Sequence, residues 1–246
     1  MMGRMRLKRL LRKAYNVFPW ARRRGLRMEL LYWDNWFDDP RNASELAYRL
    51  DPDAPVDEVW DRLLSALPTQ ARVLDVGAGP LTAIGKIFRG ERIDLVASDV
   101  LAPEYNRLLA NRDLKPPVRT LYAPSEELVR HLSPRTFHLV YCRNALDHAS
   151  DPLQSLQEMY RLLEPGGMIY LSHYPNEADH QQNAGLHQWN FNCRDGQFTI
   201  SGKGTRYVVN DLFEHVTALR TEELVIATIR KAAVSVDSPS SRISLA

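Results

Sequence analysis

Acidic side chains and small residues are spaced in this chain as a nucleotide-type cofactor site requires. Asp75 lies near the end of an apolar run, and Gly77-Ala78-Gly79 stands just beyond it, directly before Pro80. Glycine lets the backbone approach a ligand closely, and a helix that opens at Pro80 would present unpaired N–H groups. A second apolar run ends about twenty residues later at Asp99-Val100, where an acid can hold the two ribose hydroxyls of an adenosine. These residues predict a nucleotide site at the carboxyl ends of neighbouring parallel strands.

The spacing also discriminates between cofactors. A dinucleotide fingerprint requires a third glycine, but Thr82 stands at that position, which disfavours a nicotinamide oxidoreductase. The acid two residues before the first glycine instead resembles the D/E-x-G-x-G motif of the class I S-adenosylmethionine-dependent methyltransferases, although Leu81 replaces a further glycine often seen there. The resemblance implies an α/β fold with a Rossmann-like, doubly wound sheet of seven mostly parallel strands and an antiparallel last strand. It also implies S-adenosylmethionine as the cofactor, with Asp75 helping to place the methionine end.

Three further segments follow in the order of the family's motifs. The third-strand turn contains Pro124-Ser125-Glu126, for which the resemblance implies adenine contacts. Pro124 stands where an aspartate is often found, so backbone N–H groups, Ser125 or Glu126 would supply the hydrogen bond. Residues 137–148 resemble the fourth strand and its loop, where Arg143-Asn144 is assigned to the cofactor site. Residues 162–173 resemble the family's helix, a Pro-Gly-Gly turn that ends it, and the fifth strand.

Histidine side chains follow the predicted strands on the side where a methyl acceptor should lie. They are His148, His173 and His187. A hydroxyl acceptor loses its proton only at high pH and therefore benefits from a general base, most often histidine. We favour His148 as this base, because Asp147 beside it could fix its orientation. A purely structural role for each histidine stays open, and no spacing of carboxylates demands a metal ion, so no metal ligand is predicted.

Length and composition fit one globular domain with additional helices. The chain has 246 residues, 44% of them hydrophobic, which is enough for one substantial core. No apolar run approaches the ~20 residues that span a bilayer. Only Cys142 and Cys193 occur, too few for a disulfide framework or a cysteine-based metal site, so a reducing cytoplasm is the expected compartment.

Basic residues are concentrated at the N-terminal end. Residues 1–27 hold ten of the 32 Lys and Arg residues and no acid, whereas the remaining 22 bases face all 30 acids. Apolar side chains from Leu7 to Phe18 recur at helical spacing, so the segment reads as a basic amphipathic helix that could bind an anionic membrane surface through residues 1–24. That would place the protein peripherally at the inner membrane face. The alternative is an arm docked on the protein's own acidic body, and nucleic-acid binding is disfavoured by that acidic body.

The predicted organisation has four parts. They are the arm at 1–27, a helical cover at 28–68, the Rossmann-like domain at 69–231 and a serine-rich, disordered tail at 232–246. In the cover, Tyr32, Trp33 and Trp36 could line the site or could simply belong to the core. Beyond the fifth strand, His187-Gln188-Trp189-Asn190 offers a stacking surface and polar groups suited to a sugar, and 197–209 carries a hairpin signal.

The predicted activity is methyl transfer from S-adenosylmethionine to an oxygen. The expected acceptor is a small molecule or a glycan, which a lipid could carry. A binding protein that retains the fold and the nucleotide pocket without catalysis is the alternative from another class.

Overall fold

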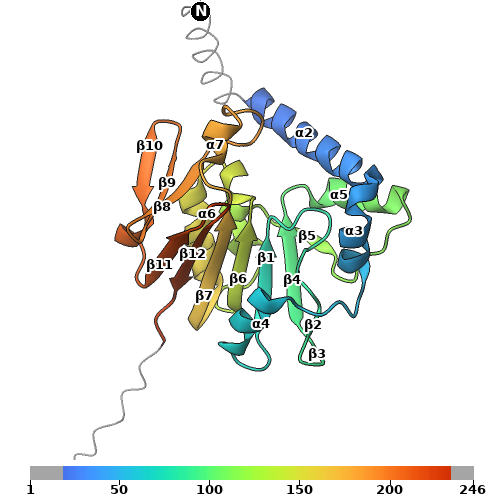
Figure 1. Cartoon of the computed structure of the whole chain (residues 1–246), viewed down its shortest axis with the longest axis horizontal. Helices are drawn as coiled ribbons and strands as arrows, with labels where there is room; N and C mark the ends of the chain where they lie inside the picture. The colour runs from blue at the N-terminus through green and yellow to red at the C-terminus, as the bar shows by residue number, and fades with distance from the viewer. Residues whose placement is uncertain (1–18, 234–246) are drawn as a thin grey trace, which may run out of the picture.

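A computed structural model describes residues 19–233 as a seven-stranded sheet with helices and a smaller sheet around it (Figure 1). The strand order is β11-β12-β7-β6-β1-β4-β5. Neighbouring strands pair in parallel except on either side of β12, which is antiparallel to both β7 and β11. The predicted fold, including its antiparallel last strand, is therefore confirmed. The strands of this sheet are β1 (Arg72–Val76), β4 (Asp94–Asp99), β5 (Thr120–Tyr122), β6 (Phe137–Arg143), β7 (Leu163–His173), β11 (Val216–Arg220) and β12 (Val225–Arg230).

Alternating side chains of the central strands divide the core between the two faces of the sheet. On β1, Leu74 and Val76 join a large cluster that includes Leu156 and Met159 of helix α6 (Pro152–Leu162). Val73 points to the opposite face and packs with residues of helix α4 (Glu58–Ser65). Both faces are buried, as expected for the near-continuous apolar runs of parallel strands.

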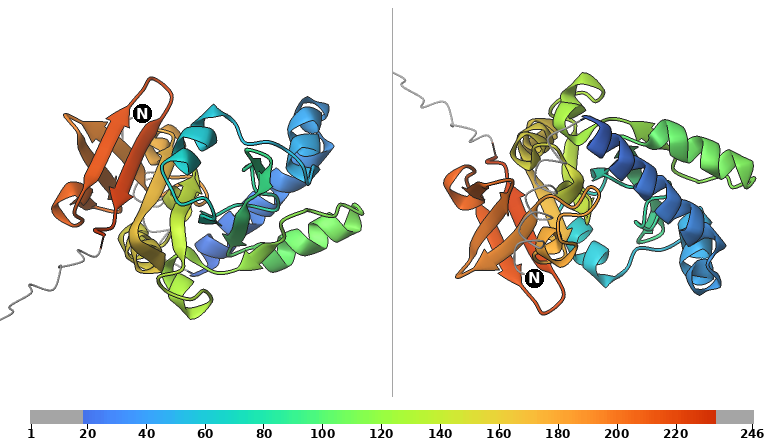
Figure 2. Two further views of the ribbon diagram at one scale, coloured as in Figure 1. Left: turned by 90° about the horizontal axis from the view of Figure 1, so that it is seen from below. Right: turned by 90° about the horizontal axis from the view of Figure 1, so that it is seen from above.

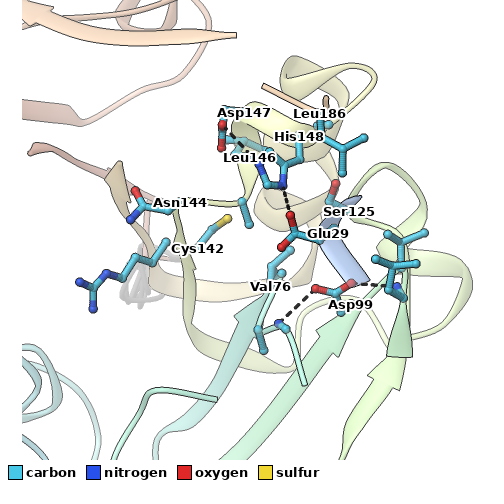
Figure 3. A pocket seen from close by; sticks show the side chains of 18 of the residues that line it. Glu29, Val76, Asp99, Ser125, Cys142, Asn144, Leu146, Asp147, His148 and Leu186 are labelled. Carbon is cyan, nitrogen blue, oxygen red and sulfur yellow. Dashed lines mark hydrogen bonds and ion pairs between the residues drawn. The ribbon is translucent and has the colours of Figure 1, made fainter. Parts of the chain in front are cut away.

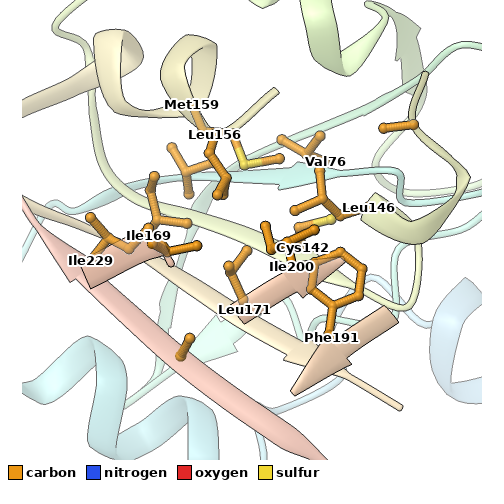
Figure 4. Packing of buried hydrophobic residues seen from close by; sticks show 14 of the residues in the cluster. Val76, Cys142, Leu146, Leu156, Met159, Ile169, Leu171, Phe191, Ile200 and Ile229 are labelled. Atoms are coloured by element: carbon orange, nitrogen blue, oxygen red, sulfur yellow. The ribbon is translucent and has the colours of Figure 1, made fainter. Parts of the chain in front are cut away.

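The smaller sheet has the order β10-β9-β8 and packs into the larger cluster. Its strands are β8 (Asn190–Arg194), β9 (Gln197–Gly202) and β10 (Thr205–Val208), and the predicted hairpin turn at Lys203-Gly204 joins the last two. Figure 4 shows Phe191 and Ile200 of this sheet close to Cys142 and Leu171 of the main sheet. A two-stranded hairpin, β2 (Ile87–Phe88) with β3 (Glu91–Arg92), lies between β1 and β4 in the chain.

Helices at the N-terminal side cover the carboxyl edge of the main sheet. Helix α2 (Pro19–Asp38) crosses above the strand ends, as both views of Figure 2 show. It continues without a break through the predicted boundary between arm and cover. The other helical elements are η1 (Pro40–Asn42), α3 (Ala43–Leu50), α5 (Ala102–Asn111), η2 (Ser125–Arg130), η3 (Leu146–His148), α7 (Glu177–His180) and η4 (Val209–Asp211).

One prediction is wrong directly after β1, because no helix begins at Pro80. The chain runs irregularly from there to β2. The hydroxyl of Thr82 accepts from the N–H of Ile84 and donates to Asp75, and this local side-chain bonding competes with a helical backbone. Lys86 N–H donates to the carbonyl of Ala54 instead of to a helical partner, so the segment is tied to the chain before α4.

The turn expected at residues 165–167 is also different. Strand β7 already begins at Leu163, where α6 ends, and pairs with β6 from Phe137 onward. Gly166 and Gly167 lie at a register shift within this pairing. Gly166 N–H donates to the carbonyl of Lys231, and the carbonyl of Gly167 accepts from the N–H of Lys231, so both pair with Lys231 and not with β6. Helix and strand therefore meet without a separate reversing loop.

Parts of the predicted ends lie outside the described residues. These are most of the basic arm, residues 1–18, and the tail from residue 234 onward. Between Pro19 and Ala233, no helix is both long and apolar enough to cross a membrane. Cys142 and Cys193 are buried and are not disulfide-bonded.

Candidate active site

A cavity of about 600 Å³ opens at the carboxyl ends of β1, β4, β6 and β7, beneath α2 (Figure 3). Every predicted site residue lines it except Pro124. The predicted residues that do line it are Asp75, Gly77, Ala78, Gly79, Asp99, Val100, Ser125, Glu126, Arg143, Asn144, His148, His173 and His187. The fold thus brings together motifs that are spread over more than a hundred residues of sequence.

The glycine turn after β1 forms the floor of the cavity. Gly77 and Gly79 have φ angles of 71° and 66°, in the left-handed region that favours glycine. A Cβ at Gly77 would collide with Ala145, and one at Gly79 would lie 2.6 Å from the ring of Trp33. Both glycines are therefore required by conformation and by space, which leaves bare backbone facing the cavity.

Asp75 is a buried carboxylate beneath this turn. Its Oδ2 accepts a 2.6 Å hydrogen bond from the hydroxyl of Thr82. Burial raises the pKa of Asp75 to about 6, although the hydrogen bond from Thr82 and the charges of Arg49 and Arg143 oppose the increase. A buried acid of this kind has its charge available for a cationic ligand group, such as the amine or sulfonium of S-adenosylmethionine.

Asp99 ends β4 on the opposite side of the turn. One of its oxygens accepts from the N–H of Gly79 at 3.1 Å and the other from the N–H of Leu101 at 2.8 Å. Burial raises its pKa to about 6, against the effect of these two hydrogen bonds. Each carboxylate oxygen retains a lone pair, so the group can still accept from ribose hydroxyls.

The loop after β5 anchors one side of the cavity. Ser125 Oγ lies 3.1 Å from Glu126 and 2.9 Å from the hydroxyl of Ser155 on α6. The other oxygen of Glu126 accepts from the N–H of Ser150 at 2.7 Å. These bonds hold the two predicted side chains in place and leave the backbone of the loop to contact an adenine ring.

Asn144 shapes the loop after β6. It has a φ of 47°, and its Oδ1 accepts from the N–H of Tyr174 at 2.9 Å. This bond joins the ends of β6 and β7. The backbone N–H of Asn144 also donates to the carbonyl of Ser172 on β7. Arg143 beside it is exposed at the cavity rim.

Aromatic side chains of α2 roof the cofactor end. Tyr32, Trp33 and Trp36 all line the cavity, which is one of the two roles considered for them, and Trp36 is also buried. The ring of Trp33 lies 6.3 Å from that of Tyr105 on α5, and the guanidinium of Arg49 lies 5.6 Å above Trp33. These contacts hold α2 against α5 and α3.

Asp147, His148 and His187 meet at the other end of the cavity. Asp147 Oδ2 lies 2.7 Å from His187 Nδ1 and 3.6 Å from His148 Nε2. The two histidine nitrogens are 3.2 Å apart, and His148 Nδ1 lies 4.0 Å from Glu29 of α2. Burial tends to raise the pKa of Asp147, but the hydrogen bond from His187 and the charges of the histidines lower it below its ordinary value.

His173 ends β7 beside this group and is fully buried. Its ring stacks on Phe191, with centroids 4.4 Å apart. Neither ring nitrogen has a hydrogen-bond partner in the structure. Burial lowers the pKa of His173 to about 4, so its imidazole is neutral near neutral pH.

Several lining residues were not predicted. Glu29, Arg49, Tyr105 and Phe191 reach the cavity from four different elements. Glu29 could have been found, because it stands four residues before Trp33 on the same helical face, and its Oε1 accepts from that indole at 3.1 Å. The other three carry no short-range signal of a site.

The surface suggested for a sugar is corrected by the structure. Trp189 is buried, and its Nε1 donates to the carbonyl of Ala149 at 2.9 Å. Gln188 is buried and bonds to the carbonyls of Asn183 and Gly185. Asn190 accepts from a backbone N–H of α7, so of the four predicted residues only His187 lines the cavity.

A family model described as a methyltransferase domain matches residues 46–216, which include both ends of the cavity apart from α2. The chain belongs to this methyltransferase family. The predicted class I S-adenosylmethionine-dependent family, enzyme class and cofactor are thereby confirmed, and the glycine turn with Asp75 and Asp99 fits that cofactor.

Curated relatives of the methyltransferase match it over less than half of their length. A ubiquinone biosynthesis O-methyltransferase of Xanthomonas campestris pv. campestris is 35% identical over 109 residues, which is 44% of this chain and 44% of that protein. A protein of the same name from Pseudomonas entomophila is 28% identical over 107 residues, covering 41% and 43%. Among solved structures, the CurJ carbon methyltransferase superposes with a TM-score of 0.51 at 16% identity, over 71% of this chain and 52% of that one, and shows the shared fold.

Proposed function

We propose that this methyltransferase transfers a methyl group to an oxygen atom of a small molecule. The observation that carries the proposal is the single cavity with two different ends. One end has the bare glycine turn between Asp75 and Asp99, and the other has the histidines around Asp147. The names of the curated relatives, which are O-methyltransferases, support oxygen as the acceptor atom.

The two ends divide the work of the reaction. When bound, S-adenosylmethionine supplies an activated methyl group, so the protein has mainly to align the acceptor and exclude water. Asp75, Asp99 and the backbone of the glycine turn would hold the cofactor under the roof of α2. His148 and His187, which line the other end of the cavity, would face the hydroxyl of an acceptor as it loses its proton.

The test is turnover with purified protein. We expect S-adenosylhomocysteine to accumulate when the protein is supplied with S-adenosylmethionine and a metabolite extract, and a product heavier by one methylene group to appear. A deletion strain should lack that product. Binding of S-adenosylhomocysteine without turnover in any extract would instead favour the non-catalytic binding protein.

His148→Ala tests the acceptor end separately. Loss of a group that handles the acceptor proton should lower kcat by ~10²–10⁴ and leave the affinity for S-adenosylhomocysteine nearly unchanged. His180→Ala is the matched control, because His180 is exposed on α7. Near-normal turnover of His148→Ala would assign His148 a structural role and leave His173 and His187 as candidates.

The proposal includes an anionic membrane surface as a partner. Arg24, Arg27, Met28 and Leu31 follow helical spacing on the described part of α2, and all four are exposed. Cationic and apolar side chains on one face suit the headgroup region of anionic lipids. Such a location would suit an acceptor carried by a lipid. Arg22 instead bonds to Ser150 of the protein body, which is the contact expected for a docked arm.

A further inference from the structure

Three electron-pair donors from two distant segments converge at the acceptor end of the cavity. Asp147 and His148 come from the loop after β6, and His187 comes from the segment before β8. The distance from His187 Nδ1 is 2.7 Å to Asp147 Oδ2 and 3.2 Å to His148 Nε2. The distance between Asp147 Oδ2 and His148 Nε2 is 3.6 Å. We infer that these three side chains form a binding site for a divalent cation of the zinc class.

The spacing of the three atoms matches the coordination shell of such an ion. Bonds of about 2.1 Å place neighbouring ligand atoms about 3.0 Å apart at right angles and about 3.4 Å apart in a tetrahedron. The three observed separations, 2.7, 3.2 and 3.6 Å, bracket these values. An ion would need only small side-chain adjustments to contact all three atoms.

Protons satisfy this group only in part. A hydrogen on His187 Nδ1 can serve the carboxylate of Asp147, but that same nitrogen is then unable to accept from His148 Nε2. If His148 donates to His187 instead, the contact between His187 and Asp147 brings two acceptors together. The remaining arrangement has one hydrogen on His187 Nδ1 shared between Asp147 Oδ2 and His148 Nε2. A cation instead accepts a lone pair from each of the three atoms at once.

The surroundings of the group also favour a cation. The carboxylate of Glu29 lies 4.0 Å from His148 Nδ1. A small side-chain movement would bring it within hydrogen-bond distance, the usual relation of an outer carboxylate to a metal-bound histidine. Figure 3 shows Glu29 pointing from α2 towards His148. Glu177 lines the same cavity and interacts electrostatically with His187.

His173 provides an independent indication of a missing ligand. It is 1% exposed and lines the cavity, and both of its ring nitrogens lack a hydrogen-bond partner. It interacts electrostatically with Asp147 and His148. A buried imidazole without any partner is costly, and an ion with its bound water would supply one.

The donor set indicates the kind of ion and its use. Two imidazoles and one carboxylate suit Zn²⁺ or a similar first-row divalent ion better than Ca²⁺ or Mg²⁺, and three protein ligands leave a position open. This step rests on the proposed function: the open position on the ion would receive the acceptor's oxygen. A bound cation lowers the pKa of a hydroxyl group that it contacts. Because the ion would then engage the lone pair of His148 Nε2, the hydroxyl proton passes to solvent and not to this histidine. The new C–O bond forms as the S–C bond breaks, and the sulfur keeps the electron pair.

Metal binding can be measured without any turnover. Protein stripped with EDTA is titrated with Co²⁺, whose visible absorption reports coordination by nitrogen and oxygen ligands, and with Zn²⁺ in thermal melts. Wild type should bind one ion per chain, and an ion concentration a hundred times the Kd should raise Tm by roughly 5–10 °C. His180→Gln, at the exposed histidine of α7, should behave like wild type.

Variants of the two histidine ligands and of Glu29 decide the outcome. His148→Gln and His187→Gln should abolish the Co²⁺ spectrum and the shift in Tm, and Glu29→Gln should weaken binding ~10–100-fold. A cooperative melt of each variant in EDTA shows that it is folded. Absence of Co²⁺ binding in wild type, or equal binding by His148→Gln and His187→Gln, would overturn the inference. Binding of S-adenosylhomocysteine in EDTA is measured separately, so failure of the proposed function is recognised on its own.

Discussion

A single carboxylate, that of Asp99, connects the two strands that form the cofactor end of the cavity. It accepts from the N–H of Gly79 in the turn after β1 and from the N–H of Leu101 beyond β4. Burial raises its pKa to about 6, so the group is partly protonated in mildly acidic solution. A ribose that donates two hydroxyl hydrogens needs the ionised form, because a protonated carboxyl has lost acceptor capacity.

The affinity for S-adenosylhomocysteine should therefore depend on pH. Between pH 7.5 and pH 5.0 the Kd of the wild type should rise roughly tenfold, since protonation one unit below a pKa of about 6 competes with the ligand. Protonation of Asp99 does not itself unfold the protein, because a raised carboxyl pKa makes this group's contribution to the free energy of unfolding larger as the pH falls from 6 towards 4. Titration calorimetry at the two pH values checks this.

The matched variant is Asp99→Asn. It should bind weakly at both pH values and lose the part of the pH dependence that Asp99 contributes, since the amide does not titrate. The part due to Asp75, whose pKa is also raised to about 6, should remain. A wild-type Kd that is equal at pH 7.5 and 5.0 would show that Asp99 does not bind the ligand in its ionised form.

At the scale of elements, helix α2 is the part that encloses the cofactor end. Trp33 lies against Gly79 and contacts Trp36 at 5.4 Å between ring centroids. Trp33→Ala should raise the Kd for S-adenosylhomocysteine and lower the free energy of unfolding by about 2–3 kcal/mol. This loss is smaller than for a fully buried tryptophan, because the side chain of Trp33 is partly exposed. Calorimetry and thermal melts measure the two effects.

Leu31→Ala is the control on the same helix, because Leu31 is 54% exposed. It should leave both quantities close to wild type. Equal Kd values for Trp33→Ala and wild type would mean that α2 does not cover the bound ligand.

The main strands could be predicted from sequence because they depend on local pattern, and their arrangement in one mostly parallel sheet was implied by the resemblance to the methyltransferase family. Apolar runs that end in an acid or a glycine turn specified β1 and β4, and the motifs in between had the family's spacing. The absence of a helix after β1 could not be predicted, since it depends on bonds of Thr82 and Lys86 to partners that only the fold brings close.

The site was predictable to a similar extent. Residues in the turns after strands were found, because parallel strands end at one edge of the sheet. The meeting of Asp147 with His187 joins residues forty positions apart, and no sequence spacing indicated it. Trp189 was misjudged, because exposure of an indole depends on packing that the sequence does not specify.

At the scale of the whole molecule, the uneven distribution of charge makes membrane association testable. Arg23, Arg24 and Arg27 are exposed on α2. Each cation near an anionic surface contributes about 1 kcal/mol, screened by salt. Substitution of all three by Gln should reduce flotation with anionic liposomes, whereas recovery with neutral liposomes should be low for both proteins.

Salt provides a control for the electrostatic part of membrane binding. Flotation of the wild type should decrease as the ionic strength is raised, since the attraction is screened beyond about 8–10 Å. Equal recovery with neutral and anionic liposomes would favour an arm docked on the protein itself.

The central claim is that the cavity beneath α2 binds the methyl donor through the glycine turn and its two acids. Thermal unfolding with S-adenosylhomocysteine tests this most directly, because the ligand binds only the folded state. At a hundred times its Kd the ligand should contribute ~2.7 kcal/mol, which raises Tm by roughly 5–10 °C for a chain of this size. Asp99→Ala should lose most of that increase. An unchanged Tm of the wild type at millimolar ligand would contradict the account.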